Sequence, residues 1–365
     1  MSKSKPNIVI VTSEFPPQPG GIGNHAYNLA LHLSNQGHDV RVVADQRSKT
    51  GNEEIDFDTS LPFSVERIKL YNPRFLMYIK RIILTFKYTR SATHCIATGK
   101  FSLWNIAFCG FFFKRKTIAV VHGTEVNFKS SLLRKSINFS LKRFNKIVAV
   151  SNYTKNLIAK LNKNVVVIPN GITTSEWKIS ENKIELKGHP VLTTVGRVSS
   201  RKGQLNVIKQ LPELVKQFPE LHYHCVGIPT EADAFMKVAE SLKVASHITF
   251  HGSVNDSKLK QTLQATDIFV MLSTESVTGD VEGFGIAILE ANAMGIPAIG
   301  SNGCGIEDAI NTGRSGLLID VNNTEAFIHG ISQILQNTSE FKTEAISWAN
   351  AHDWSHIIKR YEELL

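Results

Sequence analysis

Cysteine is scarce in this sequence: Cys95, Cys109, Cys225 and Cys304 form no CxxC pair and have no histidine at zinc spacing. That scatter argues for a reducing compartment and against a structural metal site. The first residues lack the apolar stretch and cleavage site of a secretion signal, so we expect a cytoplasmic protein. The apolar, aromatic run over residues 101–113 has 13 residues, whereas a bilayer span needs about 20.

What the sequence does contain is typical of a soluble globular chain. Hydrophobic residues make up 42% and charged residues 20% of the 365 positions, enough for two or three domains with their own cores. Acidic residues are few in one half only. Residues 1–170 carry 25 basic and 9 acidic side chains, and the remainder carries 16 and 23. This asymmetry predicts two domains with different tasks and an anionic partner for the first.

Strand-like runs alternate with helical patterns along most of the chain, which predicts an α/β fold with parallel sheets. The turn-forming Pro169-Asn170-Gly171 separates two such series and makes a plausible hinge. The predicted strands are residues 7–11, 39–44, 65–70, 93–97, 117–121, 146–150 and 165–168, then 191–195, 221–226, 247–250, 267–271, 297–300 and 316–319.

The most informative segment runs from Glu282 to Glu290. Gly283 and Gly285 leave room for a ligand close to the backbone, and the apolar residues after them predict a helix. The amino end of a helix favours an anion such as phosphate. Gly283 and Glu290 lie seven positions apart, so we expect them on one helix face. With a carboxylate on each side of the phosphate, the segment suits a ligand with two hydroxyl-rich groups, as in a nucleotide sugar.

A lone Gly-x-Gly is usually an ordinary turn, but two glutamates at this spacing form an E-x7-E pattern. The pattern resembles the retaining glycosyltransferases of family 4, in particular the mannosyltransferase-like branch that includes phosphatidylinositol mannosyltransferases. In that family the first glutamate binds donor-sugar hydroxyls and the second binds ribose hydroxyls. The resemblance gives these roles to Glu282 and Glu290, and places Gly283, Phe284 and Gly285 in the donor site.

The resemblance also implies an architecture, the GT-B fold: two Rossmann-like domains whose parallel sheets face across a cleft. The expected boundaries are 1–170 for an acceptor domain and 171–347 for a nucleotide-sugar domain. Residues 348–365 would form a helix that returns to the first domain. The implied reaction is metal-independent front-face transfer, in which the departing diphosphate helps to deprotonate the incoming hydroxyl.

Arg197, Arg201 and Lys202 follow the first predicted strand of the second half. Cations at such a position stabilise the charge that develops on a departing diphosphate, although a solvated basic loop fits equally well. The Arg-x4-Lys-Gly spacing matches the diphosphate site of the resembling family. We therefore assign this role to Arg197 and Lys202, and we expect Arg201 to lie on the surface.

A glycine-bearing loop joins the first strand to the first long helix. Eight residues separate the strand from Gly20, which disfavours the tight Gly-x-Gly-x-x-Gly turn of NAD-binding proteins. In the resembling family this loop faces the reaction centre, which makes Gly21 and Gly23 candidates for donor contacts.

His122 ends another apolar strand, where a histidine is more often structural than catalytic. The segment His122-Gly-Thr-Glu125 resembles one in which the family places a histidine beside the sugar. We assign His122 to sugar binding. The segment after residue 250 resembles the base-binding loop, with backbone contacts near Val254.

Asp56-Phe57-Asp58 could in principle hold a metal on a nucleotide sugar. It lies in a polar stretch away from the other motifs, and we predict a solvated loop and no metal cofactor. Residues 71–90 predict a basic amphipathic helix suited to an anionic membrane surface, whereas we expect residues 101–113 to pack in the core.

The predicted function is transfer of a hexose from GDP-mannose or a UDP-sugar to a lipid-linked or surface-glycan acceptor, with the protein cytoplasmic and peripheral at the membrane. Two alternatives remain open: a soluble transferase acting on a small sugar or sugar phosphate, and a non-catalytic nucleotide-sugar-binding protein. No nucleic-acid partner is expected.

Overall fold

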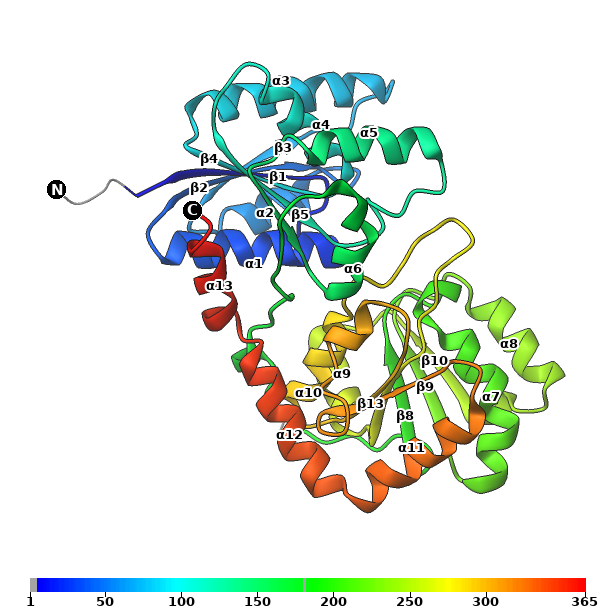
Figure 1. Cartoon of the computed structure of the whole chain (residues 1–365). Coiled ribbons are helices and arrows are strands. Elements are labelled where there is room, and N and C mark those ends of the chain that lie inside the picture. The colour runs from blue at the N-terminus through cyan, green and yellow to red at the C-terminus, as the bar shows by residue number, and fades with distance from the viewer. Residues whose placement is uncertain (1–4, 180–181) are drawn as a thin grey trace. The chain divides into compact units, whose positions relative to one another are not determined.

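The computed structural model describes residues 5–179 and 182–365. The chain forms two compact units: residues 1–170 with 354–365, and residues 171–353. Each unit is a parallel sheet with helices on both faces. In Figure 1 the first unit is coloured blue to green with a red C-terminal helix, and the second is coloured green to orange. The predicted α/β fold with two Rossmann-like domains is therefore confirmed.

The first unit has a seven-stranded sheet in the order β3-β2-β1-β4-β5-β6-β7. Each strand predicted from the sequence is present, with ends shifted by at most two residues. The strands are β1 (Asn7–Thr12), β2 (Asp39–Asp45), β3 (Ser64–Ile68), β4 (His94–Thr98), β5 (Lys116–Val121), β6 (Lys146–Ala149) and β7 (Val165–Val167).

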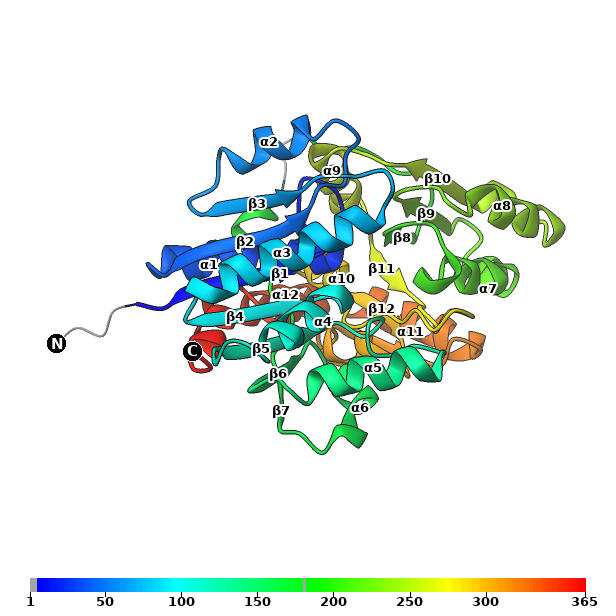
Figure 2. The ribbon, with the colours of Figure 1, turned by 90° about the horizontal axis from the view of Figure 1, so that it is seen from above.

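Helices cover both faces of this sheet, because its central strands are apolar on both sides. Figures 1 and 2 show α3, α4 and α5 over one face, and Figure 1 shows α1 over the other. The helices are α1 (Gly21–Asn35), α2 (Asn52–Asp58), α3 (Phe75–Ser91), α4 (Lys100–Cys109), α5 (Ser131–Leu141), α6 (Asn152–Leu157) and α13 (Trp354–Glu362).

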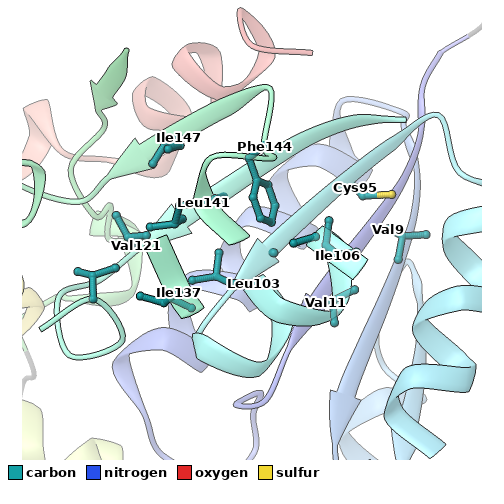
Figure 3. Packing of buried hydrophobic residues seen from close by; sticks show 14 of the residues in the cluster. Val9, Val11, Cys95, Leu103, Ile106, Val121, Ile137, Leu141, Phe144 and Ile147 are labelled. Atoms are coloured by element: carbon teal, nitrogen blue, oxygen red, sulfur yellow. The ribbon is translucent and has the colours of Figure 1, made fainter. Parts of the chain in front are cut away.

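The core of the first unit lies between the sheet and helices α4 and α5 (Figure 3). Leu103 and Ile106 of α4 and Ile137 and Leu141 of α5 are fully buried there against β-strand residues such as Val121. This packing holds the carboxyl ends of β1, β4 and β5 in fixed positions.

The C-terminal helix α13 packs on α1. His25 of α1 lies 3.0 Å from the Tyr361 hydroxyl, and the rings of His32 and Trp354 stack at 5.7 Å. The sequence analysis started this returning segment at residue 348. In the structure residues 348–353 belong to the second unit, because Trp348 lies within α12 and donates to the Ala309 carbonyl.

The second unit has a six-stranded sheet in the order β10-β9-β8-β11-β12-β13. Its strands also match those predicted from the sequence. They are β8 (Val191–Val195), β9 (His222–Val226), β10 (Ile248–Gly252), β11 (Ile268–Met271), β12 (Ala298–Ser301) and β13 (Gly316–Ile319). Its helices are α7 (Gln204–Gln217), α8 (Ala232–Ser241), α9 (Asp256–Gln264), α10 (Ile286–Ala293), α11 (Thr324–Gln336) and α12 (Thr338–Ala351).

The predicted loop at Asp56-Phe57-Asp58 is wrong, because these residues close helix α2. Glu53 and Glu54 in its first turn favour the helix by complementing its dipole. Asp58 forms a two-pronged ion pair with Arg67, at 2.7 and 2.8 Å.

The prediction that residues 101–113 pack in the core holds only for one side of α4. Leu103 and Ile106 are buried, whereas Phe108, Phe111 and Phe112 are each at least 45% exposed at its carboxyl end. Within the described ranges no helix is long and apolar enough to cross a membrane.

Candidate active site

The candidate donor site lies at the carboxyl edge of the second sheet. The strand order reverses direction between β8 and β11, and such a switch point opens a crevice between the loops that follow the two strands. The loop after β8 carries Arg197, Arg201 and Lys202, and the long connection after β11 carries Glu282. Parallel pairing of β8 with β11 therefore brings together residues about 80 positions apart.

One oxygen of Glu282 binds two cations. Its Oε2 lies 2.7 Å from Lys202 Nζ and 2.5 Å from Arg201 Nη1. The Glu282 side chain is only 11% exposed. Burial raises the pKa of this carboxyl, but Lys202 and Arg201 outweigh burial and hold the pKa below its usual value. Glu282 is therefore an anion at neutral pH, ready to accept hydrogen bonds from hydroxyls.

Arg201, expected on the surface, is partly exposed at 31% but pairs with Glu282. Residues Ser200–Lys202 form a 3-10 turn directly after β8, and this turn directs both Arg201 and Lys202 toward Glu282. Arg197, which the sequence favoured over Arg201, is exposed. In the sequence, the signal for Arg201 was that it forms a pair of adjacent cations with Lys202 just before a glycine. The sequence analysis assigned the diphosphate role to Arg197 and not to Arg201 because only Arg197 has the Arg-x4-Lys-Gly spacing.

The helix after the motif begins later than the sequence suggested. Helix α10 starts at Ile286, with Gly285 as its cap at a φ of +95°. Gly283 thus precedes the helix and does not share a helix face with Glu290. The left-handed conformation of Gly285, which glycine adopts without a steric cost, turns the chain into α10.

Backbone contacts hold the Glu282–Gly285 turn in place. The Gly305 amide donates to the Glu282 carbonyl at 2.9 Å, and a Cβ at Gly305 would lie 2.0 Å from the Gly283 oxygen. Phe284 as a whole is 2% exposed, so its side chain belongs to the core of the second unit.

Glu290 lies on the second turn of α10 and is partly buried. Burial raises the pKa of its carboxyl to about 7. Lys202 lowers this pKa, while Asp256 and Glu176 raise it. Lys202 therefore acts on both glutamates of the motif: it pairs with Glu282 and attracts Glu290.

The proposed base-binding residue Val254 lies between β10 and α9 and is partly exposed. The preceding His251 is tied to the neighbouring strand, where its Nε2 lies 2.9 Å from His224 Nδ1. The other nitrogen of His224 lies 3.0 Å from the Lys187 carbonyl and donates to it. These contacts fix the start of the loop.

In the first unit, His122 follows β5 and is buried. Its Nε2 lies 2.8 Å from Thr98 Oγ1, and its ring meets that of His25 edge-on at a centroid distance of 4.9 Å. Burial lowers the pKa of His122 to about 3, so the ring is neutral. Glu125 accepts a hydrogen bond from the His122 amide, and its other oxygen has no partner among the described residues.

Sequence reasoning missed His25, Thr98 and Glu125. The signal for Glu125 was its place in the same short segment as His122. Thr98 depends on strand order, which brings the ends of β4 and β5 together. His25 comes from α1, whose packing places its ring against His122. The order also reverses between β1 and β4, so this cluster lies at the switch point of the first sheet.

Gly21 and Gly23 differ in their surroundings. Gly21 begins α1, and a Cβ there would meet open space. At Gly23 a Cβ would lie 3.0 Å from the backbone of Glu14 and Phe15. Gly23 thus allows close packing of its own loop, whereas Gly21 leaves a helix start open to a ligand.

Two family descriptions match the chain, one for each unit. "Glycosyl transferases group 1" matches residues 175–351, and "Glycosyltransferase Family 4" matches residues 19–176. The chain is 26% identical to the GDP-mannose-dependent alpha-(1-6)-phosphatidylinositol monomannoside mannosyltransferase of Mycolicibacterium smegmatis. That alignment covers 90% of this chain and 89% of the relative.

Another relative is also described as a glycosyltransferase, and two solved structures share the fold. Lipopolysaccharide core biosynthesis glycosyltransferase LpsE of Rhizobium meliloti is 31% identical over 41% of each chain. A glycosyltransferase from Rickettsia africae superposes with a TM-score of 0.79 at 20% identity, covering 99% of this chain and 98% of the other. Anabaena HepE, solved with UDP and glucose, superposes with a TM-score of 0.77 at 18% identity, covering 98% of each.

Proposed function

The chain belongs to glycosyltransferase family 4, with the GT-B fold and dependence on a nucleotide sugar, and we propose that it transfers a hexose with retention of configuration to a hydroxyl of a lipid-linked or surface-glycan acceptor. The donor in this proposal is GDP-mannose or a UDP-sugar. The mannosyltransferase relative, aligned over 90% of the chain, favours GDP-mannose.

The observation that carries the proposal is the group formed by Glu282, Lys202 and Glu290. Lys202 stands 2.7 Å from Glu282 and also attracts Glu290. A cation paired with one carboxylate and within electrostatic reach of a second carboxyl group suits a diphosphate with a sugar on one side and a ribose on the other. Glu282 would accept from sugar hydroxyls, and Glu290 from ribose hydroxyls.

The chemistry follows from charge. As the sugar–phosphate bond breaks, negative charge grows on the diphosphate, and Lys202 stabilises this charge more in the transition state than in the ground state. The leaving oxygen then takes the proton of the incoming hydroxyl. We assign a sugar contact to neutral His122, which suits hydrogen bonding, and no metal ion is needed in this scheme.

We also propose that the first unit contacts an anionic membrane through α3. Phe75, Ile79, Ile82 and Ile83 are each at least 42% exposed along this helix. The four exposed cations beside them are Arg74, Lys80, Lys87 and Arg90. Basic and apolar side chains on one surface helix favour anionic lipid headgroups.

The structure modifies this membrane proposal in two ways. Arg81, counted with the basic face from the sequence, is buried and pairs with Asp45 at 3.0 Å between Nε and Oδ1. Phe112 meets Phe86 of α3 at a centroid distance of 5.4 Å, which adds the exposed aromatic end of α4 to the same surface.

A thermal-shift panel tests the donor site. The ligands are GDP, UDP and ADP with their hexose conjugates, each with and without EDTA, on the wild type, on Glu290→Ala and on Glu344→Ala as a surface control. A ligand at 100 times its dissociation constant stabilises by about 2.7 kcal/mol. We expect one nucleotide and its hexose conjugates to raise the melting temperature of the wild type, with or without EDTA. Glu290→Ala should lose this rise, and Glu344→Ala should keep it. Stabilisation by NAD alone, or by no nucleotide, would contradict the proposal.

Transfer itself needs a second assay. We expect labelled hexose to pass from the active donor to a bacterial membrane lipid extract, with an α-linkage by NMR. Transfer to a sugar phosphate instead would favour the soluble alternative. Binding without any consumption of donor would favour the non-catalytic one.

A further inference from the structure

Glu282 pairs with two cations, Arg201 and Lys202, although one would balance its charge. Lys202 alone would neutralise the carboxylate, and yet Arg201 Nη1 approaches the same oxygen to 2.5 Å. Arg201 is 31% exposed, and Lys202 is 16% exposed. The two cations and one anion leave a net positive charge beside the glycines that precede α10.

Glu282 cannot do without a cation. With 11% of its side chain exposed, it has lost most of its hydration, and an unpaired charge in such a place is costly. A donor diphosphate competes with Glu282 for Lys202. When Lys202 turns to the diphosphate, Arg201 is the remaining cation on Glu282.

We propose that Arg201 is a positioning residue, which keeps Glu282 ionised and aimed at the hydroxyls of the donor sugar while Lys202 binds the diphosphate. This inference rests on the proposed function of the same site. It assigns Arg201 a role through Glu282 and not a direct contact with the phosphates.

Hydrogen bonds and close packing hold the backbone around Arg201 in one position. The Ser200 amide donates to Glu231 Oε2 at 3.1 Å, and the Lys202 amide donates to the Ser199 carbonyl at 3.0 Å. Gly203 closes the turn at a φ of +83°, where a Cβ would lie 2.1 Å from the Leu272 carbonyl group. The turn is therefore packed on the backbone that follows β11.

The opposite partner is held as well. The Glu282 carbonyl accepts from the Gly305 amide at 2.9 Å, so the main chain on both sides of the ion pair is anchored. A planar guanidinium between two anchored segments can direct the carboxylate, because its donors have a fixed geometry. A lysine ammonium at position 201 would supply charge without this geometry.

Isothermal titration calorimetry on the full chain tests the inference. The probes are GDP with GDP-mannose and UDP with UDP-glucose, and the pair that the wild type binds is carried forward. In Arg201→Gln we expect the Kd for the nucleotide sugar to rise by about tenfold or more, because a charge-assisted hydrogen bond to Glu282 is lost. The Kd for the sugar-free nucleotide should rise much less. Arg201→Lys should restore only part of the difference.

A double-mutant cycle separates positioning from direct contact. If Arg201 acts through Glu282, Arg201→Gln combined with Glu282→Gln should bind the nucleotide sugar no more weakly than Glu282→Gln alone. Arg314→Gln, which breaks an exposed ion pair with Glu344 in the same unit, is the matched control and should bind as the wild type. Thermal melting of each variant checks that it is folded.

Two results would overturn the inference while leaving the proposed function intact. One is an equal loss for nucleotide and nucleotide sugar in Arg201→Gln, which would mark a phosphate contact. The other is additivity with Glu282→Gln. A wild type that binds no nucleotide at all would instead remove the proposed function, and this inference with it.

Discussion

Thr98 and His122 lie at the carboxyl ends of neighbouring strands, and Thr98 Oγ1 is 2.8 Å from His122 Nε2. This contact orients a buried imidazole whose pKa is lowered to about 3 by its burial. The ring therefore works as a neutral hydrogen-bonding group and not as an acid.

Replacing His122 with glutamine should lower kcat/KM by about tenfold to a hundredfold, the cost of one strong hydrogen bond to the substrate. Because His122 does not titrate near neutrality, the shape of the pH–rate profile between about pH 5 and 9 should stay the same. His329→Gln, at an exposed position on α11, is the control. A change in the acidic limb of the profile in His122→Gln alone would contradict a neutral His122.

Glu290 should make nucleotide binding depend on pH. Burial raises the pKa of its carboxyl to about 7, so the ionised form grows as the pH rises through this value. A carboxylate accepts from ribose hydroxyls better than a carboxylic acid, and we expect the Kd for the nucleoside diphosphate to fall from about pH 6 to 8. In Glu290→Gln this dependence should flatten, leaving only the titration of the phosphate itself. Calorimetry at three pH values measures the Kd of the wild type and of Glu290→Gln. An equal change of Kd with pH in the two proteins would refute the assignment.

The histidines of β9 and β10 should make the protein less stable in mild acid. Burial lowers the pKa of His222 to about 4 and also lowers those of His224 and His251. In the unfolded chain these rings titrate near about 6.5, so below that pH the unfolded state binds more protons than the folded state. The free energy of unfolding should therefore fall as the pH drops from about 7 to 4.

Urea titrations across this range test the effect, with His224→Asn as the variant. The lost ring removes one of the protons taken up on unfolding, so the variant should lose less stability between neutral pH and pH 5 than the wild type does. The exposed His329→Gln should keep the slope of the wild type. A slope unchanged in His224→Asn would show that other groups dominate the acid transition.

The α3 surface should bind anionic vesicles. Reversing Lys80 and Lys87 to glutamate should reduce partitioning onto phosphatidylglycerol vesicles by more than tenfold, since each basic residue near such a surface contributes about 1 kcal/mol. The control with the same change in net charge is Lys209→Glu with Lys237→Glu, at exposed positions of the second unit. Sedimentation with charged and with neutral vesicles, at low and high salt, measures the effect. Equal losses in both double variants would indicate unspecific charge attraction.

Local patterns were sufficient for the strands, whereas the roles predicted for the donor-site residues stay predictions. Each of the thirteen predicted strands is present, because alternating apolar runs and helices leave few other folds open. The start of α10 was misplaced, since only the left-handed conformation of Gly285 shows where the chain turns. The acidic pair at Asp56 and Asp58 was read as a loop because seven residues give too little helical periodicity.

By itself, the sequence determined the two α/β units, the order of their elements and the residue types gathered around the glutamate pair. Only the tertiary structure decided that Arg201 and Lys202 meet Glu282, because their positions depend on a 3-10 turn packed on the backbone that follows β11, 70 positions away. It also decided that His122 is neutral and paired with Thr98. Burial and strand neighbours, which set hydration and the partners of a charge, arise only when distant segments pack together.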